Sequence, residues 1–172
     1  MDKNKVDIDD TNISLDLSDA TQAVKENRFQ DAILLLQRIL KDKPDNIDAL
    51  YLSAVSSRYL KKFDESKGYI MDLLSNAPDM GRAYQEYGHL NRDQGDEEKA
   101  VMHYRQACEL NPALLASWNF LYQYFTKYKN KAAADHAEEQ LKKLQSLPRL
   151  LLYISQILNE GRLGLAEEKC RA

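Results

Sequence analysis

Cysteine is scarce in this sequence: Cys108 and Cys170 are far apart and have no Cys-x-x-Cys spacing. A small domain held together by disulfides needs more cysteines, and a structural zinc site needs a local cluster of ligands. We therefore expect two reduced thiols in a cytoplasmic protein, and no metal site.

The sequence also lacks long apolar runs and a surplus of positive charge. Its longest apolar stretch, LPRLLLYISQIL, is interrupted by Arg149, and the polar, acidic N-terminus has no signal core. Hydrophobic residues make up 44%, charged residues make up 30% and the net charge is −3, an ordinary balance for a soluble domain. These features predict neither a membrane span nor export, and the basic stripe typical of nucleic-acid binding is missing.

Motifs for phosphate binding or catalysis are missing as well. The six glycines are scattered and form no glycine-rich phosphate loop. His89, His103 and His136 fall in three different predicted helices without the i, i+4 spacing of a metal pair, so we interpret them as solvated or groove side chains. Acidic pairs lie at turns or early in helices, where carboxylates cap the helix. The chain itself is therefore predicted to be non-catalytic and to need no cofactor.

What the sequence does contain is a fixed period. Pro44, Pro78 and Pro112 are evenly spaced, and Pro148 follows at a slightly longer interval. Small residues repeat with the spacing of the first three prolines in two sets, Ala32, Ser66, Ala100 and Ala134, and Ala20, Ala54 and Gly88. A shared period of about 34 residues indicates an array of structural repeats.

Each repeat is predicted to be two helices joined by a short turn. Between residues 79 and 94 the apolar positions recur at i, i+3 and i+4, which predicts an amphipathic helix. Gly95 can adopt the left-handed conformation that ends a helix, and Asp96 can cap the next one. The second helix stops at Asn111-Pro112, because proline lacks the amide donor.

Small residues are expected where the two helices of a repeat cross. Gly88 and Ala100 fit this role, since small side chains permit a close approach of the helix axes. Tyr122 and Ile154 take the small-residue position in the fourth and fifth repeats. We expect them to open the helix pair or to shift its stacking. Cys108 falls on the packing face of a second helix and is expected to be a core residue.

The third repeat resembles the tetratricopeptide repeat (TPR) through Tyr84, Tyr87-Gly88, Ala100, Tyr104, Ala107 and Pro112. The first repeat departs from the pattern, because Asp16 and Asp19 stand where apolar residues are expected. The resemblance covers about residues 13–172 and implies an all-α, right-handed solenoid of antiparallel helix hairpins. Residues 1–12 are expected to be a disordered tail. The expected units are about 13–46, 47–80, 81–114, 115–146 and a partial unit at 147–172.

The first helices of TPR proteins line a concave groove, so the resemblance implies a protein or peptide partner. Carried over by register, the predicted binding residues are Tyr51, Arg58, Tyr59, Arg82, Gln85, His89, Arg92, Asn119, Gln123 and Lys127. Tyrosine and arginine are common anchors at interfaces. The clamp with which some TPR proteins hold acidic chaperone tails is disfavoured, because only Arg82 matches it. The other equivalent positions hold Asp48, Leu52, Glu86, Ala116 and Phe120.

A finer resemblance concerns the C-terminal part. NPALLASWNFLYQYF, AAADHAEEQLKKLQSLP and LNEGRLGLAEEKCRA look like the TPR segment ahead of the catalytic domain in bacterial TPR-sulfotransferase proteins. This resemblance implies a further domain that uses 3′-phosphoadenylyl sulfate and is not in these 172 residues. Two hypotheses stay open: a free-standing adaptor, and a segment that dimerises or presents substrate for such a domain. A homodimer is expected through residues 147–172, where apolar residues lack a covering helix.

Overall fold

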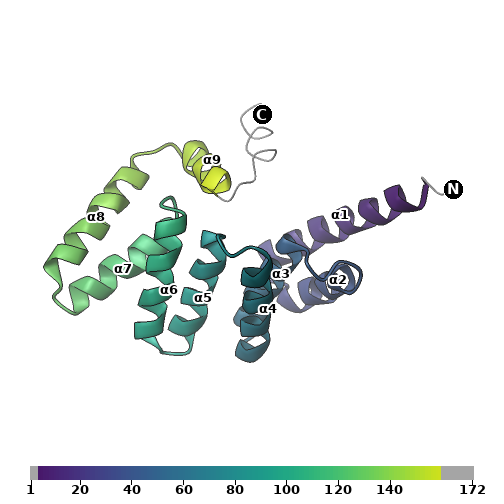
Figure 1. The fold of residues 1–172 in the computed structure, drawn as a ribbon, viewed down its shortest axis with the longest axis horizontal. Coiled ribbons are helices and arrows are strands. Elements are labelled where there is room, and N and C mark those ends of the chain that lie inside the picture. Colours follow the sequence, from purple (N-terminus) through teal and green to yellow (C-terminus); the bar gives the residue numbers. More distant parts are fainter. Residues whose placement is uncertain (1–3, 160–172) are drawn as a thin grey trace. The chain divides into compact units, whose positions relative to one another are not determined.

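A computed structural model describes residues 4–159 of the chain, with side chains from 12 to 158. Within that range the fold is all-helical, with nine helices and no strand, as the periodicity predicted (Figure 1). The helices are α1 (Asn4–Lys25), α2 (Phe29–Asp42), α3 (Ile47–Tyr59), α4 (Phe63–Asn76), α5 (Gly81–Asp93), α6 (Glu97–Leu110), α7 (Leu115–Lys127), α8 (Lys131–Gln145) and α9 (Arg149–Asn159).

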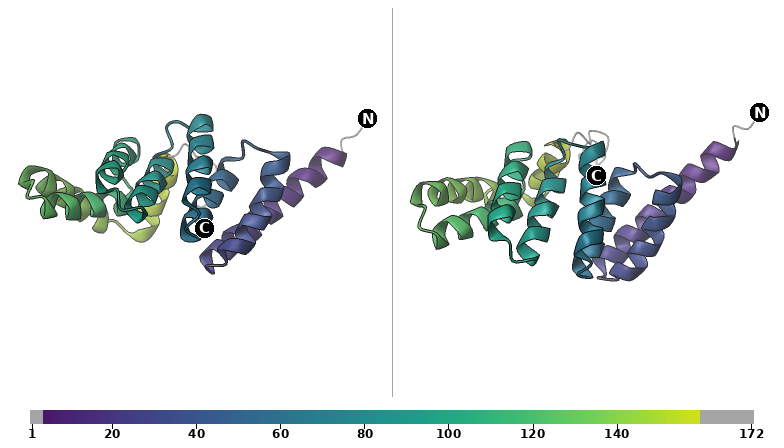
Figure 2. Two further views of the ribbon diagram at one scale, coloured as in Figure 1. Left: turned by 90° about the horizontal axis from the view of Figure 1, so that it is seen from below. Right: turned by 60° about the horizontal axis from the view of Figure 1, so that its bottom comes forward.

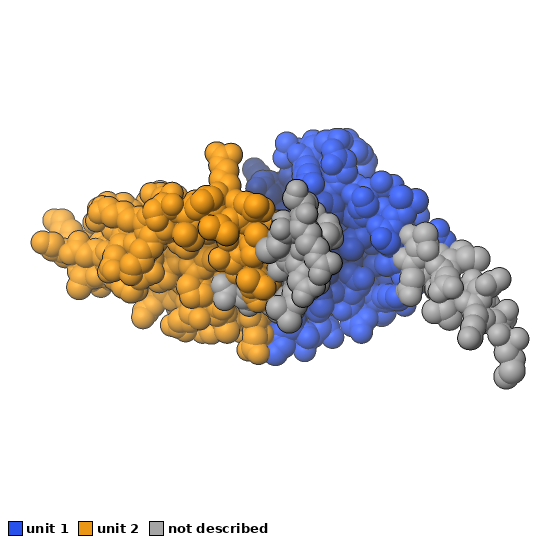
Figure 3. All heavy atoms as spheres, turned by 90° about the horizontal axis from the view of Figure 1, so that it is seen from above, with its two compact units in different colours: residues 1–78 blue, residues 79–172 orange. Residues whose placement is uncertain are grey.

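Each of the first eight helices packs with one neighbour as an antiparallel hairpin: α1 with α2, α3 with α4, α5 with α6, and α7 with α8 (Figures 1 and 2). The chain divides into two compact units, residues 1–78 and residues 79–172 (Figure 3). The first unit contains α1–α4, and the second contains α5–α9.

Helix α1 is longer than the sequence pattern indicated. Residues 1–12 were expected to be disordered, but α1 begins at Asn4. No glycine or proline occurs before Lys25, so nothing in the sequence interrupts the helix. Asp16, which looked misplaced in an apolar position, lies 2.7 Å from the Arg38 guanidinium of α2. The ion pair explains how a carboxylate is accommodated beside the buried Ala20 and Leu36.

The turn inside each hairpin uses the same backbone geometry. Among residues 4–159, four have positive φ and occur once in each hairpin at equivalent positions: Asn27 (59°), Lys61 (59°), Gly95 (82°) and Lys129 (56°). The amide of the following residue donates back to the preceding helix in every case, for example Asp96 N to Asn91 O at 2.9 Å and Asn130 N to Phe125 O at 2.9 Å. This arrangement satisfies carbonyl groups at the helix end. The left-handed conformation predicted for Gly95 is confirmed, whereas the three non-glycine examples were not anticipated.

Side-chain caps begin three of the helices. The predicted cap at Asp96 is confirmed, since its carboxylate accepts from Lys99 N at 3.0 Å. Asn46 and Asn130 play the same part at α3 and α8, where they accept from Ala49 N and Ala133 N. Each cap satisfies one of the amide groups that a helix start leaves without an internal partner.

The helix crossings follow the small residues. Gly88 faces the fully buried ring of Tyr104, and a Cβ at Gly88 would lie 2.8 Å from Tyr104 Cδ1. In the preceding hairpin the Ser66 hydroxyl donates to Ala54 O at 2.9 Å. Tyr122, at the corresponding position of α7, is half-buried and lines a shallow cavity of about 350 Å³ together with Ala134. The bulky side chain thus lies at the rim of the α7–α8 hairpin.

Helix α9 contacts the connection between α6 and α7. Asn111 Nδ2 donates to Gln156 O at 3.1 Å, and Gln156 Nε2 donates to Ala113 O at 2.8 Å. Ile154 is buried, whereas Leu151 and Leu158 are 49% and 47% exposed. Leu165, the remaining member of the predicted apolar stripe, lies outside the described residues, and the homodimer through 147–172 stays a prediction.

Candidate peptide-binding surface

Two first helices lie side by side in the second unit, α5 and α7. Ser117 Oγ on α7 donates to Gln85 Oε1 on α5 at 3.0 Å. Ser117 is fully buried, so the hydrogen bond fixes the spacing of the two helices from inside. Gln85 and the other predicted residues on these helices define what we call the α5–α7 surface: Arg82, Gln85, His89, Arg92, Asn119, Gln123 and Lys127.

On the α5 side of this surface, His89 and Arg92 make short polar contacts with other side chains of the protein. His89 Nδ1 lies 2.5 Å from the hydroxyl of Tyr104, and the two rings meet edge to face. Arg92 pairs with its neighbour Asp93 at 2.7 Å and stays exposed. Arg82 is half-buried near the start of the helix. Gln85 and His89 therefore serve packing as well as presenting polar atoms.

The α7 side contains three exposed residues of the predicted set. Asn119 and Gln123 are exposed, one helical turn apart, and neither side chain makes a hydrogen bond within the described residues. Carboxamide groups both donate and accept, so this pair can bind either group of a peptide backbone.

Lys127 has a different environment from Asn119 and Gln123. Its ammonium group lies 2.7 Å from the Glu97 carboxylate at the start of α6, and the Tyr128 hydroxyl donates to the same carboxylate at 3.1 Å. The hydrogen bond from Lys127 lowers the pKa of Glu97 below its ordinary value, and Tyr128 adds to this shift. Glu97 in turn raises the pKa of Lys127. Both groups are exposed, so the pair contributes little to stability.

The first unit holds Tyr51, Arg58 and Tyr59 on α3. Tyr51 is half-buried and Arg58 is buried, with 6% of its surface exposed. The Tyr59 ring stacks on Phe29 with centroids 4.5 Å apart and planes 2° from parallel. The Arg58 guanidinium carbon lies 4.4 Å from the centre of the Tyr59 ring, a cation–π contact.

Tyr59 and Lys127 occupy equivalent positions, and so do their partners. Tyr59 and Lys127 are two repeat lengths apart, and the same interval separates Phe29 from Glu97. In each unit the last turn of a first helix contacts the first residue of the preceding second helix. The contact is aromatic in one unit and ionic in the other. This position therefore packs against the preceding hairpin, and Tyr59 and Lys127 stay predicted contact residues.

The three histidines all contact aromatic rings, and these contacts were not predicted from the sequence. His103 stacks on Tyr87 with ring centroids 3.9 Å apart. His136 meets Trp118 edge to face at 5.5 Å. The repeat spacing could have predicted the contact between His103 and Tyr87, because the two residues lie on the facing helices of one hairpin. Burial lowers the pKa of His103, and the nearby Lys99 lowers it further.

Metal ligands do not gather in the part of the chain that the structure describes: no group of three histidine, cysteine or acidic side chains is placed to hold a metal ion. Likewise, none of the helices described is both long and apolar enough to cross a membrane. Cys108 is buried as expected, and its burial raises the pKa of the thiol to about 12.

Comparison with known proteins supports the repeat class. A family model for the tetratricopeptide repeat matches residues 81–114, which span the α5–α6 hairpin. No curated protein matches the sequence.

Three solved structures share the fold. MamA has a TM-score of 0.63 at 16% identity, with 93% of this chain and 87% of MamA covered. A mutant O-GlcNAc transferase from Thermobaculum terrenum has a TM-score of 0.65 at 20% identity, with 73% of this chain and 23% of that chain covered. The Naa15/Naa10 complex bound to HypK-THB has a TM-score of 0.68 at 17% identity, with 91% of this chain and 24% of that chain covered.

These likenesses define the chain as an all-helical repeat protein built from hairpins. The family match and the structural neighbours together support the tetratricopeptide-repeat family, and the direct family match is confined to one hairpin. At identities of 16–20% the structural neighbours show the fold alone.

Proposed function

We propose that this chain is a protein- or peptide-binding module, non-catalytic by itself, and that the α5–α7 surface is its contact face in the second unit. The observation that carries the proposal is the pair Asn119 and Gln123, which is exposed and makes no side-chain hydrogen bond within the described residues. A packed scaffold holds this pair in place through the hydrogen bond between Ser117 and Gln85.

The chemistry of the surface suits an extended peptide. A peptide backbone carries one donor and one acceptor per residue, and carboxamides can meet both. Arg92 adds a cation beside the amides, although Asp93 already neutralises part of its charge. Because the amides project from packed helices, binding need not order a mobile loop, which lowers its entropic cost.

The first unit contributes a separate candidate site on α3. Tyr59 is 55% exposed although it stacks on Phe29, so one part of the ring stays accessible. Tyr51, Arg58 and Tyr59 stay predicted contact residues, of which Tyr59 is the most exposed and Arg58 is buried. The structure of Naa15/Naa10 bound to HypK-THB supports protein binding by a fold of this kind.

Site-directed photo-cross-linking tests the proposal. A benzophenone amino acid replaces Gln123 on the α5–α7 surface, and a matched control replaces Gln145, an exposed amide near the end of α8. The expected result is a specific cross-linked partner from Gln123 that the Gln145 position does not capture. Equal capture of the same partner at both positions would contradict the assignment of the surface.

A second candidate is that the chain is the repeat segment of a larger enzyme, where it dimerises or presents substrate to a sulfotransferase domain. Its support is the C-terminal resemblance, together with the observation that this fold covers only 23% of the O-GlcNAc transferase chain. An immunoblot of native lysate separates the two candidates. A band near 19.8 kDa favours the adaptor, and a much larger band favours the enzyme segment.

A further inference from the structure

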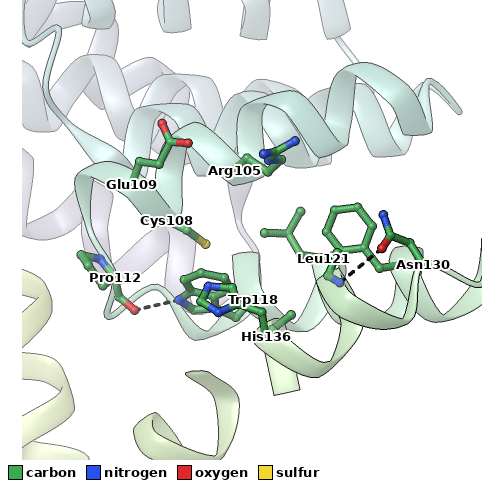
Figure 4. A pocket seen from close by; sticks show the side chains of 11 residues that line it. Arg105, Cys108, Glu109, Pro112, Trp118, Leu121, Asn130 and His136 are labelled. Carbon is green, nitrogen blue, oxygen red and sulfur yellow. Dashed lines mark hydrogen bonds between the residues drawn. The ribbon is translucent and has the colours of Figure 1, made fainter. Parts of the chain in front are cut away.

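A cavity of about 530 Å³ lies between α6, α7 and α8 in the second unit (Figure 4). Its α7 side is formed by Trp118, Leu121 and Phe125. Cys108 on α6 and Ala137 on α8 form the opposing walls. The volume is that of a site for a small organic molecule. None of the residues predicted for peptide binding lines it, so this cavity is separate from the α5–α7 surface.

Two walls of the cavity are formed by small residues at positions where the first unit has larger ones. The positions of Cys108 and Ala137 correspond to Leu40 and Tyr69 in the first unit, which lie two repeats earlier. Leu40 and Tyr69 are both half-buried there. At these two positions the second unit therefore has small side chains where the first unit has large ones. Aromatic rings of α7 form the remaining wall of the cavity.

The inner part of the cavity offers an apolar surface. Trp118 Nε1 already donates to Pro112 O at 2.9 Å, so the indole presents its ring to the space (Figure 4). With a pKa raised to about 12, the Cys108 thiol is neutral at physiological pH. An occupant gains by placing hydrocarbon against these walls, because apolar area is removed from water.

The rim is charged, and its two ends differ. Arg105 lies at the end near Asn130, where α8 begins. Its guanidinium group makes no ion pair with any side chain that the structure describes. Glu109 lies one turn further along α6, beside Pro112, and the Arg105 and Glu109 side chains point in different directions (Figure 4). An anionic head group is therefore attracted to the Arg105 end and repelled from the Glu109 end.

We propose that this cavity binds a small amphipathic organic anion, with its head group on Arg105 and its apolar body against Trp118. Arg105 and Pro112 are separated by about 10 Å along the axis of α6 at the rise of an α-helix, a length that a medium-length acyl chain spans. The amide of Asn130 stands beside the head group, although its oxygen is already used as the cap of α8.

Trp118 provides a local reporter, because it is the one tryptophan in the chain. The probe is ω-bromodecanoate, whose bromine quenches indole fluorescence only near contact. The control has the same brominated chain with a trimethylammonium group in place of the carboxylate. We expect saturable quenching by the carboxylate and at most weak quenching by the cation. Equal quenching by both compounds would overturn the proposal, since it would indicate apolar adsorption without recognition of charge.

Two exposed positions on the rim give a matched pair of variants. Arg105→Gln is expected to weaken ω-bromodecanoate binding roughly tenfold, because it removes a charge-assisted hydrogen bond. Glu109→Gln should leave the affinity unchanged or raise it. Both side chains are exposed, so neither change is expected to disturb folding. Unchanged affinity in Arg105→Gln would overturn the assignment of the head group.

Filling the cavity gives an independent test. Ala137→Tyr introduces the residue that the first unit has at this position, and it should abolish quenching while the helical circular dichroism signal is retained. Retained quenching in a folded Ala137→Tyr protein would place the probe elsewhere and overturn the proposal. If the variant does not fold, the Arg105→Gln and Glu109→Gln pair decides.

Discussion

Tyr104 fills the space that a side chain at position 88 would need. A Cβ built on Gly88 lies 2.8 Å from both Cδ1 and Cε1 of the Tyr104 ring. The ring cannot move away easily, because it is fully buried, contacts Phe120 at 4.5 Å between ring centroids and bonds to His89 through its hydroxyl. A close approach of α5 and α6 is thus set by one glycine and one tyrosine.

Substitution of Gly88 by alanine is expected to destabilise the protein. Overpacking costs roughly 1–3 kcal/mol, which equals or exceeds the gain of about 1 kcal/mol from the better helix propensity of alanine. The free energy of unfolding in urea measures the balance. Gly68→Ala is the matched control, because nothing lies within 4 Å of a Cβ at that helical position. It should stabilise by roughly 0.5–1 kcal/mol. The same sign for both variants would contradict the packing described.

The left-handed turn residues make a second prediction. Lys129→Gly should stabilise the protein by up to about 1 kcal/mol, because glycine adopts positive φ without the steric cost that lysine has there. Gly95→Ala should destabilise by about 1 kcal/mol for the converse reason. Thermal unfolding monitored by circular dichroism measures both. Lys67→Gly, within helix α4, is the control and should destabilise. A loss of stability in Lys129→Gly would contradict the turn geometry.

His103 makes stability depend on pH. Its pKa is lowered in the folded protein by burial first and by Lys99 second. Below the ordinary pKa of histidine the unfolded chain binds a proton that the folded protein resists, so the free energy of unfolding should fall as the pH drops from about 7 to 5. His103→Gln should flatten this dependence, and Lys99→Gln, which removes the smaller cause, should flatten it less. An unchanged pH dependence in His103→Gln would show that other groups produce it.

The fold could be predicted from the sequence because its prolines and small residues recur at a constant interval. A constant repeat interval in proline and small residues located the hairpins, and Gly95 and Asp96 gave the geometry of one turn. Helix α1 begins at Asn4, inside the segment expected to be a disordered tail, since a polar composition does not prevent a helix that lacks glycine and proline.

The contacts of individual surface residues were harder to predict. The stacking of Tyr59 on Phe29 and the pairing of Lys127 with Glu97 depend on how successive hairpins meet, which repeat register alone did not reveal. The cavity beside Trp118 was also missed, because Cys108 was expected to be an ordinary core residue. Its presence depends on the combined volume of several side chains, which no single position indicates.

Isothermal titration calorimetry with the peptide captured at Gln123 tests the proposed contact face most directly. The double variant Asn119→Ala with Gln123→Ala should bind that peptide at least about tenfold more weakly, because two exposed hydrogen-bonding groups are lost. The control, Gln37→Ala with Gln145→Ala, removes two exposed amides away from the α5–α7 surface and should bind like the native protein. Native affinity in the Asn119 and Gln123 variant would show that the peptide contacts another face.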